Sequence, residues 1–423
     1  MTDKVQGGLK WLGRLYVLVL VGLCALTVSW LSLDVHSGAF EREIRTGGLK
    51  HLDFVRFYAM GKLSASPDRL HVYDAQTQLD WVNAVIYPAS RPHVLYMEYP
   101  PWAFLPLIAL AYTRLDIAYI GWSVLSVVAA CGGAFVLRRC NPELRAGDAA
   151  VLMLAACGSY VAFNCLVAGQ LAMFLLLLLS LFFWALRGQR NWLGGCVLGL
   201  ISIKLQYLPF LLIPLVVLKR WRMMVSYAVA QAALLAAAGL WFGWASIAAY
   251  PQSLLSSETH VGLVYNSVNS MVSLRGLLAP LVSKQASAYF GFVTMACGLA
   301  LTWWLWRAER DRERRWSMAL TPLIAIVFCP HSYLYDVLVL AVSAALTLPS
   351  FSLRRLAGLT PPAYRMWAFV LAIYPAAGWF LPVQETGTYF LSFLIVNVLL
   401  LVLGLRAFWI AGSSEDACAP MPD

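Results

Sequence analysis

The chain has 423 residues, of which 61% are hydrophobic and 12% are charged, with a formal net charge of +10. Apolar runs of membrane-spanning length recur from Leu12–Leu33 to Leu391–Ile410, which predicts an all-α polytopic membrane protein. Solid runs such as Leu171–Phe183 argue against a β-barrel, whose strands alternate apolar and polar positions. The basic residues cluster between the runs, as in cytoplasmic loops. The positive net charge therefore reflects the topology of the chain, and we expect no nucleic-acid partner.

The first apolar run is preceded by Lys4, Lys10 and Arg14, which predicts a cytoplasmic N-terminus and places residues 34–100 outside the membrane. The run is too long for the core of a signal peptide, so we expect it to remain as an anchor. Eight of the 21 acidic residues fall in the loop 34–100. This concentration indicates chemistry at the outer face of the membrane.

An amphipathic helix is predicted inside this first loop, lying on the membrane surface, because apolar residues recur at steps of three and four. These residues are Leu52, Val55, Ala59 and Leu63. Asp53 and Arg56 share the opposite face, one turn apart. A carboxylate held rigidly against the bundle is suited to accept a proton from a reacting hydroxyl, so Asp53 is the candidate catalytic residue.

The second half of the chain predicts a regular topology. Its spans lie near 223–245, 286–306, 316–330, 334–349, 364–382 and 388–411. They put the basic clusters on one side of the membrane, and the loop 246–285, His331 and the turn Leu381–Thr388 on the other. The C-terminus is then cytoplasmic, after a single membrane domain of residues 1–412, and the polar stretch 413–423 is expected to be a disordered tail.

The first half is less regular, because a simple count of spans leaves three arginines outside the membrane: Arg138, Arg139 and Arg145. Two short or broken helices remove the conflict, one after Tyr99-Pro100-Pro101 and one interrupted at Lys204-Leu205-Gln206 and Pro209. Broken helices in membranes usually line a cavity, since their free backbone groups need partners. We therefore expect about twelve spanning or half-spanning helices.

A series of short motifs follows the chain in order. It comprises Asp53-Phe54-x-x-Phe57-Tyr58, Val72-Tyr73-Asp74, Tyr99-Pro100-Pro101 with Pro106-Leu107, Gly169-Gln170, Lys204-x-Gln206, Asn266 and Asn269, Pro330-His331-Ser332-Tyr333, and Tyr335-Asp336. Each motif alone is a common string. The ordered series, from about residue 12 to 345, resembles glycosyltransferase family 87, a group of membrane enzymes of the GT-C type.

The resemblance implies a GT-C-type bundle that transfers a sugar with inversion on the extracytoplasmic side of a bacterial cytoplasmic membrane. The donor is expected to be a polyprenyl-phosphate sugar, often mannose in this family, and the acceptor a hydroxyl of a lipid or glycan. Asp53 matches the acid that follows the first span and acts as general base. Membrane lipids are the other expected partners.

The donor phosphate requires positive charge or hydrogen-bond donors. Lys204 lies within the apolar stretch Trp192–Leu218, where a charge is costly and by default functional. It is a candidate phosphate ligand, and snorkelling or an ion pair with an acid such as Asp336 is the alternative. His331 and Arg275 are further candidates, since the predicted topology places both on the outer side.

The remaining candidates are polar or aromatic residues for binding the sugar or the acceptor. They are Arg56, Tyr58, Glu98, Tyr99, Gln170, Gln206, Asn266, Asn269, Tyr335 and Asp336. Second roles stay open for some of them: Arg56 would orient Asp53, Glu98 would be solvated, and the two glutamines would link helices by hydrogen bonds.

Metal and cofactor chemistry is not expected. The nine cysteines are scattered, without a CxxC pair or a metal-like Cys/His spacing. The first loop also lacks the DxD acid pair that suggests a metal-dependent transferase.

Two other classes of function compete with a transferase. A transporter or flippase would carry polar residues near the bilayer midplane and an internal repeat between its halves, and we find no such repeat. A lipid-carrier ligase of the O-antigen type would use a large loop between late spans with essential arginines, whereas the largest loop here comes first.

Overall fold

The computed structural model describes residues 3–48, 50–92, 94, 95, 97–259, 264, 265, 271–311, 313–351, 353–359, 362–380 and 391–416. Several predictions fall outside these residues, namely Asn266, Asn269, the turn Leu381–Thr388 and the tail from 417 to 423. The last helix continues to Asp416, so residues 413–416 of the predicted disordered tail are helical.

The described chain is helical almost throughout, as predicted. Its first part contains α1 (Asp3–His36), α2 (Ala39–Arg45), α3 (Leu52–Ala65), η1 (Pro67–His71), α4 (Ala75–Ile86), β1 (Val94–Leu95), η2 (Pro101–Ala103), η3 (Pro106–Tyr112), α5 (Leu115–Cys140), α6 (Ala146–Gly158), α7 (Tyr160–Ala168) and α8 (Ala172–Arg187). Its second part contains α9 (Asn191–Ile201), η4 (Ser202–Tyr207), α10 (Leu208–Val217), α11 (Trp221–Phe242), α12 (Trp244–Thr259), β2 (Val264–Tyr265), α13 (Leu274–Leu278), α14 (Lys284–Ala308), α15 (Arg315–Phe328), η6 (Leu334–Val339), α16 (Leu340–Thr347), α17 (Leu353–Ala357), α18 (Pro362–Ala377), η7 (Gly378–Phe380) and α19 (Leu391–Asp416).

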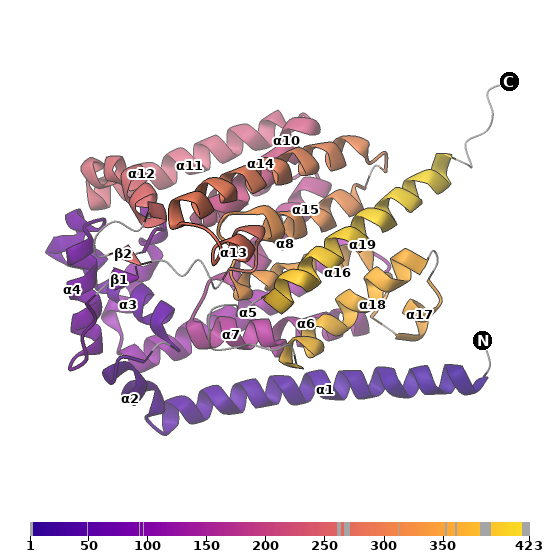
Figure 1. Ribbon diagram of the computed structural model, residues 1–423, viewed down its shortest axis with the longest axis horizontal. Helices are drawn as coiled ribbons and strands as arrows, with labels where there is room; N and C mark the ends of the chain where they lie inside the picture. The colour runs from indigo at the N-terminus through magenta and orange to yellow at the C-terminus, as the bar shows by residue number, and fades with distance from the viewer. Residues whose placement is uncertain are drawn as a thin grey trace.

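The bundle has two distinct ends (Figure 1). At one end Arg187 pairs with Glu313 at 2.5 Å, and Arg315 pairs with Glu143 at 2.7 Å. We call this the basic end; the start of α1 and the end of α19 lie there too. We call the opposite end, where α2, α3 and α4 gather, the loop end. There β1 pairs in parallel with β2, Val94 opposite Val264, which joins the two predicted outer loops.

The three arginines that conflicted with the charge rule lie near the basic end. Arg138 and Arg139 end α5, and Arg145 precedes α6, so all three flank Glu143. The segment between Pro101 and Tyr112 forms two short 3₁₀ helices, of which η2 packs on α11 and η3 packs on α3. The break expected after Tyr99-Pro-Pro is therefore present, and it removes the conflict.

The helices α9 and α10 form a hairpin around η4. Gly194, Gly195 and Gly199 of α9 contact Met223, Ser226 and Ala230 of α11 in the same order, so α9 and α11 run parallel. Since only the short segment 218–220 separates α10 from α11, α10 must return to the end where α9 begins. Lys204, with φ −109° and ψ 79°, interrupts the helix at the hairpin tip, as the sequence predicted.

A second hairpin combines α6, α7 and α8. The pair α6–α7 bends by 50° because Ser159 is extended and its hydroxyl accepts a hydrogen bond from the Ala162 N–H, which starts a new helix. The chain turns at Gly169-Gln170, and α8 returns to Arg187 at the basic end.

A third hairpin joins α15 to η6 and α16. It starts at Arg315 at the basic end and turns through residues 329–333. It comes back to the same end, where Asn141 donates hydrogen bonds to the carbonyls of Ala345 and Leu348, at 2.9 and 3.0 Å.

The arms of these hairpins are short. Helix α8 has 16 residues and α15 has 14, which correspond to lengths of about 24 and 21 Å, less than the roughly 30 Å of a bilayer core. The turns therefore lie inside the bundle, where protein surrounds their non-helical backbone.

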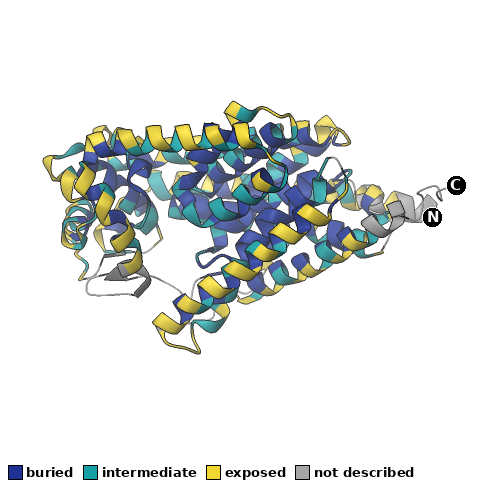
Figure 2. Cartoon of the chain, turned by 90° about the horizontal axis from the view of Figure 1, so that it is seen from above, coloured by how far each residue is buried: buried dark blue, intermediate teal, exposed yellow. Residues whose placement is uncertain are grey.

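The number of membrane crossings stays partly a prediction. By length and composition, six described helices, or up to seven with the bent pair counted as one, are apolar enough to cross a membrane. Asn191–Val217 is among them, although it folds back on itself as a hairpin. The expected number of about twelve spanning or half-spanning helices is not confirmed. Large apolar side chains face outward on the long helices, among them Val28, Val128 and Leu240, as expected for contact with lipid (Figure 2).

Helix α3 begins where predicted but is covered by other elements of the protein. Nine of its residues are buried, on nearly all sides: Phe54, Val55, Phe57, Tyr58, Ala59, Met60, Gly61, Leu63 and Ser64. Gly61 lies directly against the Leu107 carbonyl of η3. The predicted polar face of the helix is covered, because α4, α5, α7 and η3 pack on the sides that the apolar stripe left open. The position of α3 relative to the membrane surface stays a prediction.

Candidate functional site

Asp53 lies in the first turn of α3, and both of its carboxylate oxygens accept hydrogen bonds. Oδ1 accepts from Nη1 of Arg56 at 3.0 Å, as expected for residues one turn apart. Oδ2 accepts from Nε2 of Gln170 at 2.5 Å, although the two residues are 117 positions apart. The carboxylate is partly accessible, with 19% of its side chain exposed. It is thus held in place while still open to a substrate.

Gln170 reaches Asp53 because the preceding residue is glycine. Gly169 ends α7 with φ +77°, and a Cβ there would come within 2.5 Å of Cβ of Phe54. Nε1 of Trp122 donates to the Gly169 carbonyl at 2.8 Å and fixes the turn from the α5 side. Only glycine combines this left-handed backbone with so close an approach of α3.

We expect Gly169→Ala to destabilise the protein by about 1–3 kcal/mol and to reduce activity, because α3 must move away from Gln170. Thermal unfolding in detergent and a transfer assay measure the two effects. Gly121→Ala is the control, since Gly121 lies within α5 and has nothing within 4 Å of its added Cβ. Equal behaviour of the two variants would contradict this account of the turn.

Lys204 pairs with Asp336 at the tip of the α9–α10 hairpin. Both side chains are buried, with 5% and 0% exposed. The other carboxylate oxygen of Asp336 accepts from the Tyr333 N–H at 3.1 Å, and the Lys204 ammonium lies 5.0 Å from the ring of Tyr335. The ion pair that the sequence left as an alternative is therefore present.

Arg275 and His331 lie next to one another near the same turns. Nη1 of Arg275 is 3.3 Å from Nε2 of His331, and the arginine is 1% exposed. Gln206 donates from Nε2 to the His331 carbonyl at 3.2 Å, which ties the α9–α10 tip to the turn after α15. Two candidate phosphate ligands thus meet, as a guanidinium beside an imidazole.

Tyr99 lies in the segment before η2, next to α3. Burial raises the pKa of Tyr99 to about 12, with smaller opposing effects from Lys204 and Asp336 and then from Asp53 and Arg56. Its phenol is therefore protonated at neutral pH and able to donate a hydrogen bond. The ring of Tyr99 packs against α3, with its centroid 5.6 Å from that of Phe57.

Two of the predicted substrate-binding residues have structural contacts elsewhere. The hydroxyl of Tyr58 donates to the Thr113 carbonyl at 2.8 Å, on the η3 side of α3. Glu98 is half-buried, and its backbone carbonyl accepts from the Tyr250 hydroxyl at 3.4 Å. Tyr335 does lie at the site, stacked on Tyr333 with ring centroids 5.6 Å apart.

Sequence reasoning missed Trp122 and the neighbours of His51, because neither carries a motif. Trp122 sits in an apolar run that resembles any other span, and His51 lies in a loop of charged residues. Within the described ranges, no three His, Cys, Asp or Glu side chains come together as metal ligands. The expectation of a reaction without metal or cofactor stays a prediction.

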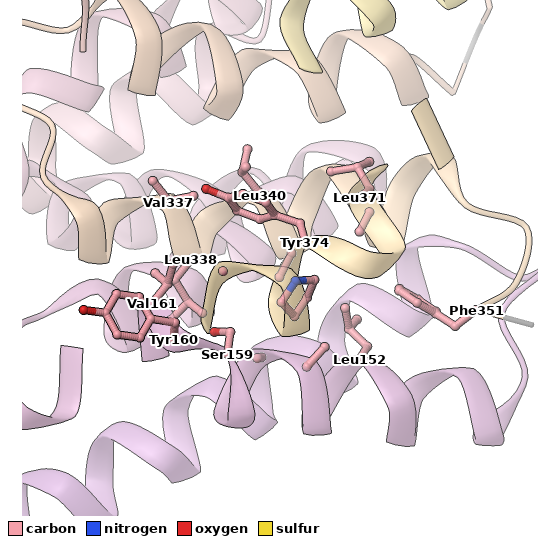
Figure 3. A pocket seen from close by; sticks show the side chains of 16 residues that line it. Leu152, Ser159, Tyr160, Val161, Val337, Leu338, Leu340, Phe351, Leu371 and Tyr374 are labelled. Atoms are coloured by element: carbon pink, nitrogen blue, oxygen red, sulfur yellow. The ribbon is translucent and has the colours of Figure 1, made fainter. Parts of the chain in front are cut away.

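An apolar groove adjoins the site between α6, α16 and α18 (Figure 3). The empty space in and above it amounts to about 520 Å³, open space included. Leu152 and Val161 line one side, and Leu340 and Leu371 line the other. Val337, directly after Asp336, also faces it, so the groove begins one residue beyond the buried ion pair.

Comparisons with known proteins show the family of the chain. The model of glycosyltransferase family 87 matches residues 96–330, more than half of the chain. This range includes Gln170, Lys204 and Arg275 and begins after Asp53. Over 141 residues the chain is 34% identical to an alpha-(1→3)-arabinofuranosyltransferase of Corynebacterium glutamicum. The match spans 32% of this chain and 32% of that relative. The chain is a multi-pass membrane protein that belongs to glycosyltransferase family 87.

Proposed function

We propose that this protein transfers a sugar from a polyprenyl-phosphate donor to a hydroxyl of a lipid or glycan acceptor, with inversion at the anomeric carbon. The observation that carries the proposal is a held carboxylate at the turn of one helical hairpin, which packs beside the joined turns of two others. Asp53 contacts Gln170 of one turn, and Lys204 and His331 belong to the other two. A transporter explains these contacts less well, since the chain belongs to a transferase family.

In the proposed reaction, Asp53 takes the proton from the acceptor hydroxyl as its oxygen attacks the anomeric carbon. The bond from that carbon to the phosphate oxygen breaks, and the electron pair leaves with the lipid phosphate. Arg275 and His331 stabilise the charge on the departing phosphate. Lys204 is the weaker phosphate candidate, because Asp336 already balances its charge.

The donor sugar has two candidates. Mannose is the donor that the motifs suggested, and the name of the matched relative points to arabinofuranose for that protein. We propose a polyprenyl-phosphate sugar of one of these types. The basic end then faces the cytoplasm, and the site opens toward the outside of a bacterial cytoplasmic membrane.

The test uses the purified chain in nanodiscs with a lipid extract from its host as acceptor. Radiolabelled polyprenyl-phosphate mannose and polyprenyl-phosphate arabinose are offered in separate reactions. We expect label to move from one donor into a lipid or glycan that mass spectrometry identifies. Consumption of neither donor, with other polyprenyl-phosphate sugars also inert, would reject the proposed function and favour the transporter class.

The apolar groove is proposed to hold part of a hydrocarbon chain of the lipid-linked donor. Ala341 lines it and is only half-buried, so Ala341→Phe fills the groove without disturbing the core. We expect KM for a long-chain donor to rise about tenfold, as a few buried CH₂ groups are lost. The same variant with a short-chain donor is the control. An equal change in KM for both donors would show that the hydrocarbon chain of the donor binds elsewhere.

A further inference from the structure

A buried histidine directly precedes the helix that carries Asp53. His51 is 1% exposed, and its Nε2 lies 3.0 Å from Oδ2 of Asp34 and 3.7 Å from Oε2 of Glu43. Asp34 is near the end of α1 and Glu43 is in α2. The imidazole therefore joins the first span and α2 to the start of α3.

The other ring nitrogen contacts the second hairpin. Nδ1 of His51 lies 2.8 Å from the carbonyl oxygen of Val167, near the end of α7. A carbonyl only accepts, so Nδ1 is the donor of this hydrogen bond. Two residues after Val167 comes Gly169, and then Gln170, which donates to Asp53.

The contacts form a closed loop of four steps. His51 leads along the backbone to Asp53, which accepts from Gln170; Gln170 leads back along the chain to Val167, which accepts from His51. Aromatic rings surround the imidazole, with Phe40 and Tyr119 at centroid distances of 4.9 and 5.2 Å. A hydrogen bond in such a buried, close-packed place holds geometry more firmly than one in water.

We propose that His51 is a positioning residue for the sugar transfer, which fixes Asp53 against Gln170 through its hydrogen bond to the Val167 carbonyl. The inference rests on the proposed function of Asp53 and concerns a different residue. His51 itself does not touch substrate; it sets the distance between the start of α3 and the end of α7. Small displacements of a general base reduce the rate more than they reduce binding.

The test compares two substitutions, each of which keeps a nitrogen at the place of one of the two ring nitrogens of His51. The amide nitrogen of His51→Asn occupies the place of Nδ1, so the bond to Val167 is retained while the contact with the carboxylates is lost. His51→Gln places its amide near Nε2, so an amide faces the carboxylates while the Val167 carbonyl loses its donor. We expect kcat to fall about tenfold in the Gln variant and about threefold or less in the Asn variant, with donor KM unchanged.

Coupling to Gln170 distinguishes positioning from general loss of structure. Gln170→Leu alone should reduce kcat, and His51→Gln added to it should reduce kcat no further, since both act on the same contact. Tyr119→Phe is the control: it removes a hydrogen bond from the same pocket to the Leu166 carbonyl, at 3.1 Å, and should lower stability without changing kcat. Additive losses, or equal kcat in the Asn and Gln variants, would overturn the inference.

Hydrogen–deuterium exchange supplies a readout that does not depend on activity. The amides of Gly169 and Gln170 donate to the carbonyls of Leu166 and Cys165 at 3.1 and 2.8 Å. Peptides covering 165–171 should exchange about tenfold faster in His51→Gln than in His51→Asn. Unchanged exchange would overturn the positioning role even if transfer by the wild type were not found, whereas an inactive wild type with altered exchange rejects only the proposed function.

Discussion

Replacing Asp53 with asparagine is expected to lower kcat/KM for sugar transfer by about 10²–10⁴, the range contributed by a general base. The change is close to isosteric. Oδ1 of the new amide still accepts from Arg56, and Gln170 can rotate its own amide so that its oxygen, buried without a partner among the described residues, accepts from the new NH₂. The fold should therefore persist while the base is lost.

The measurement is initial rate with radiolabelled donor, together with donor binding by competition and thermal unfolding in detergent. Asp80→Asn is the matched control, because Asp80 is an exposed acid of α4 that accepts from the nearby Gln76 at 2.7 Å. It should leave rate and binding unchanged. Transfer by the Asp53 variant within about threefold of wild type would remove Asp53 from the mechanism.

Lys204→Met is expected to cost about 3–5 kcal/mol of stability, since it leaves the fully buried Asp336 carboxylate without its cation. Adding Asp336→Asn should recover most of the loss. Asparagine removes the charge and still accepts from the Tyr333 N–H. Thermal unfolding in detergent measures each step.

Arg114→Met provides the comparison for an exposed ion pair. Arg114 pairs with Asp116 at 3.0 Å with 73% of its side chain exposed, so its loss should cost less than about 1 kcal/mol. A Lys204 variant no less stable than the Arg114 variant would show that the buried pair does not hold the hairpin tip. If the double variant folds and keeps its donor KM, Lys204 has no part in phosphate binding.

Much of the local structure follows from sequence. The apolar runs mark the long helices α1, α5, α11, α14 and α19 because hydropathy is a property of each segment alone. The Asp53–Arg56 contact follows in the same way, since residues one turn apart on a helix are neighbours. The interruption at Lys204 was also visible, because a lysine beside polar and proline residues weakens an apolar helix.

The packing around each helix was predicted less well than the position of the helix along the chain. The stripe of α3 suggested a helix with one covered face, but four further elements bury it. Tyr58 was grouped with Asp53 because both belong to one motif, and the structure shows that its hydroxyl donates to the Thr113 carbonyl. Two residues five positions apart on a helix point in different directions. Only the packing of the helix shows which of these directions faces the substrate.

The sequence by itself determined that the chain is a helical membrane protein and where the helix breaks at Lys204, because hydropathy and helix-breaking residues act over a few positions. It proposed Asp53 as the base through its motifs. Only the tertiary structure decided that Gln170 holds Asp53 and that Asp336 neutralises Lys204, across 117 and 132 positions. Those contacts depend on where three short hairpins turn. Their turns meet because arms shorter than the bilayer leave polar backbone and side chains inside the bundle, where they must find partners in one another.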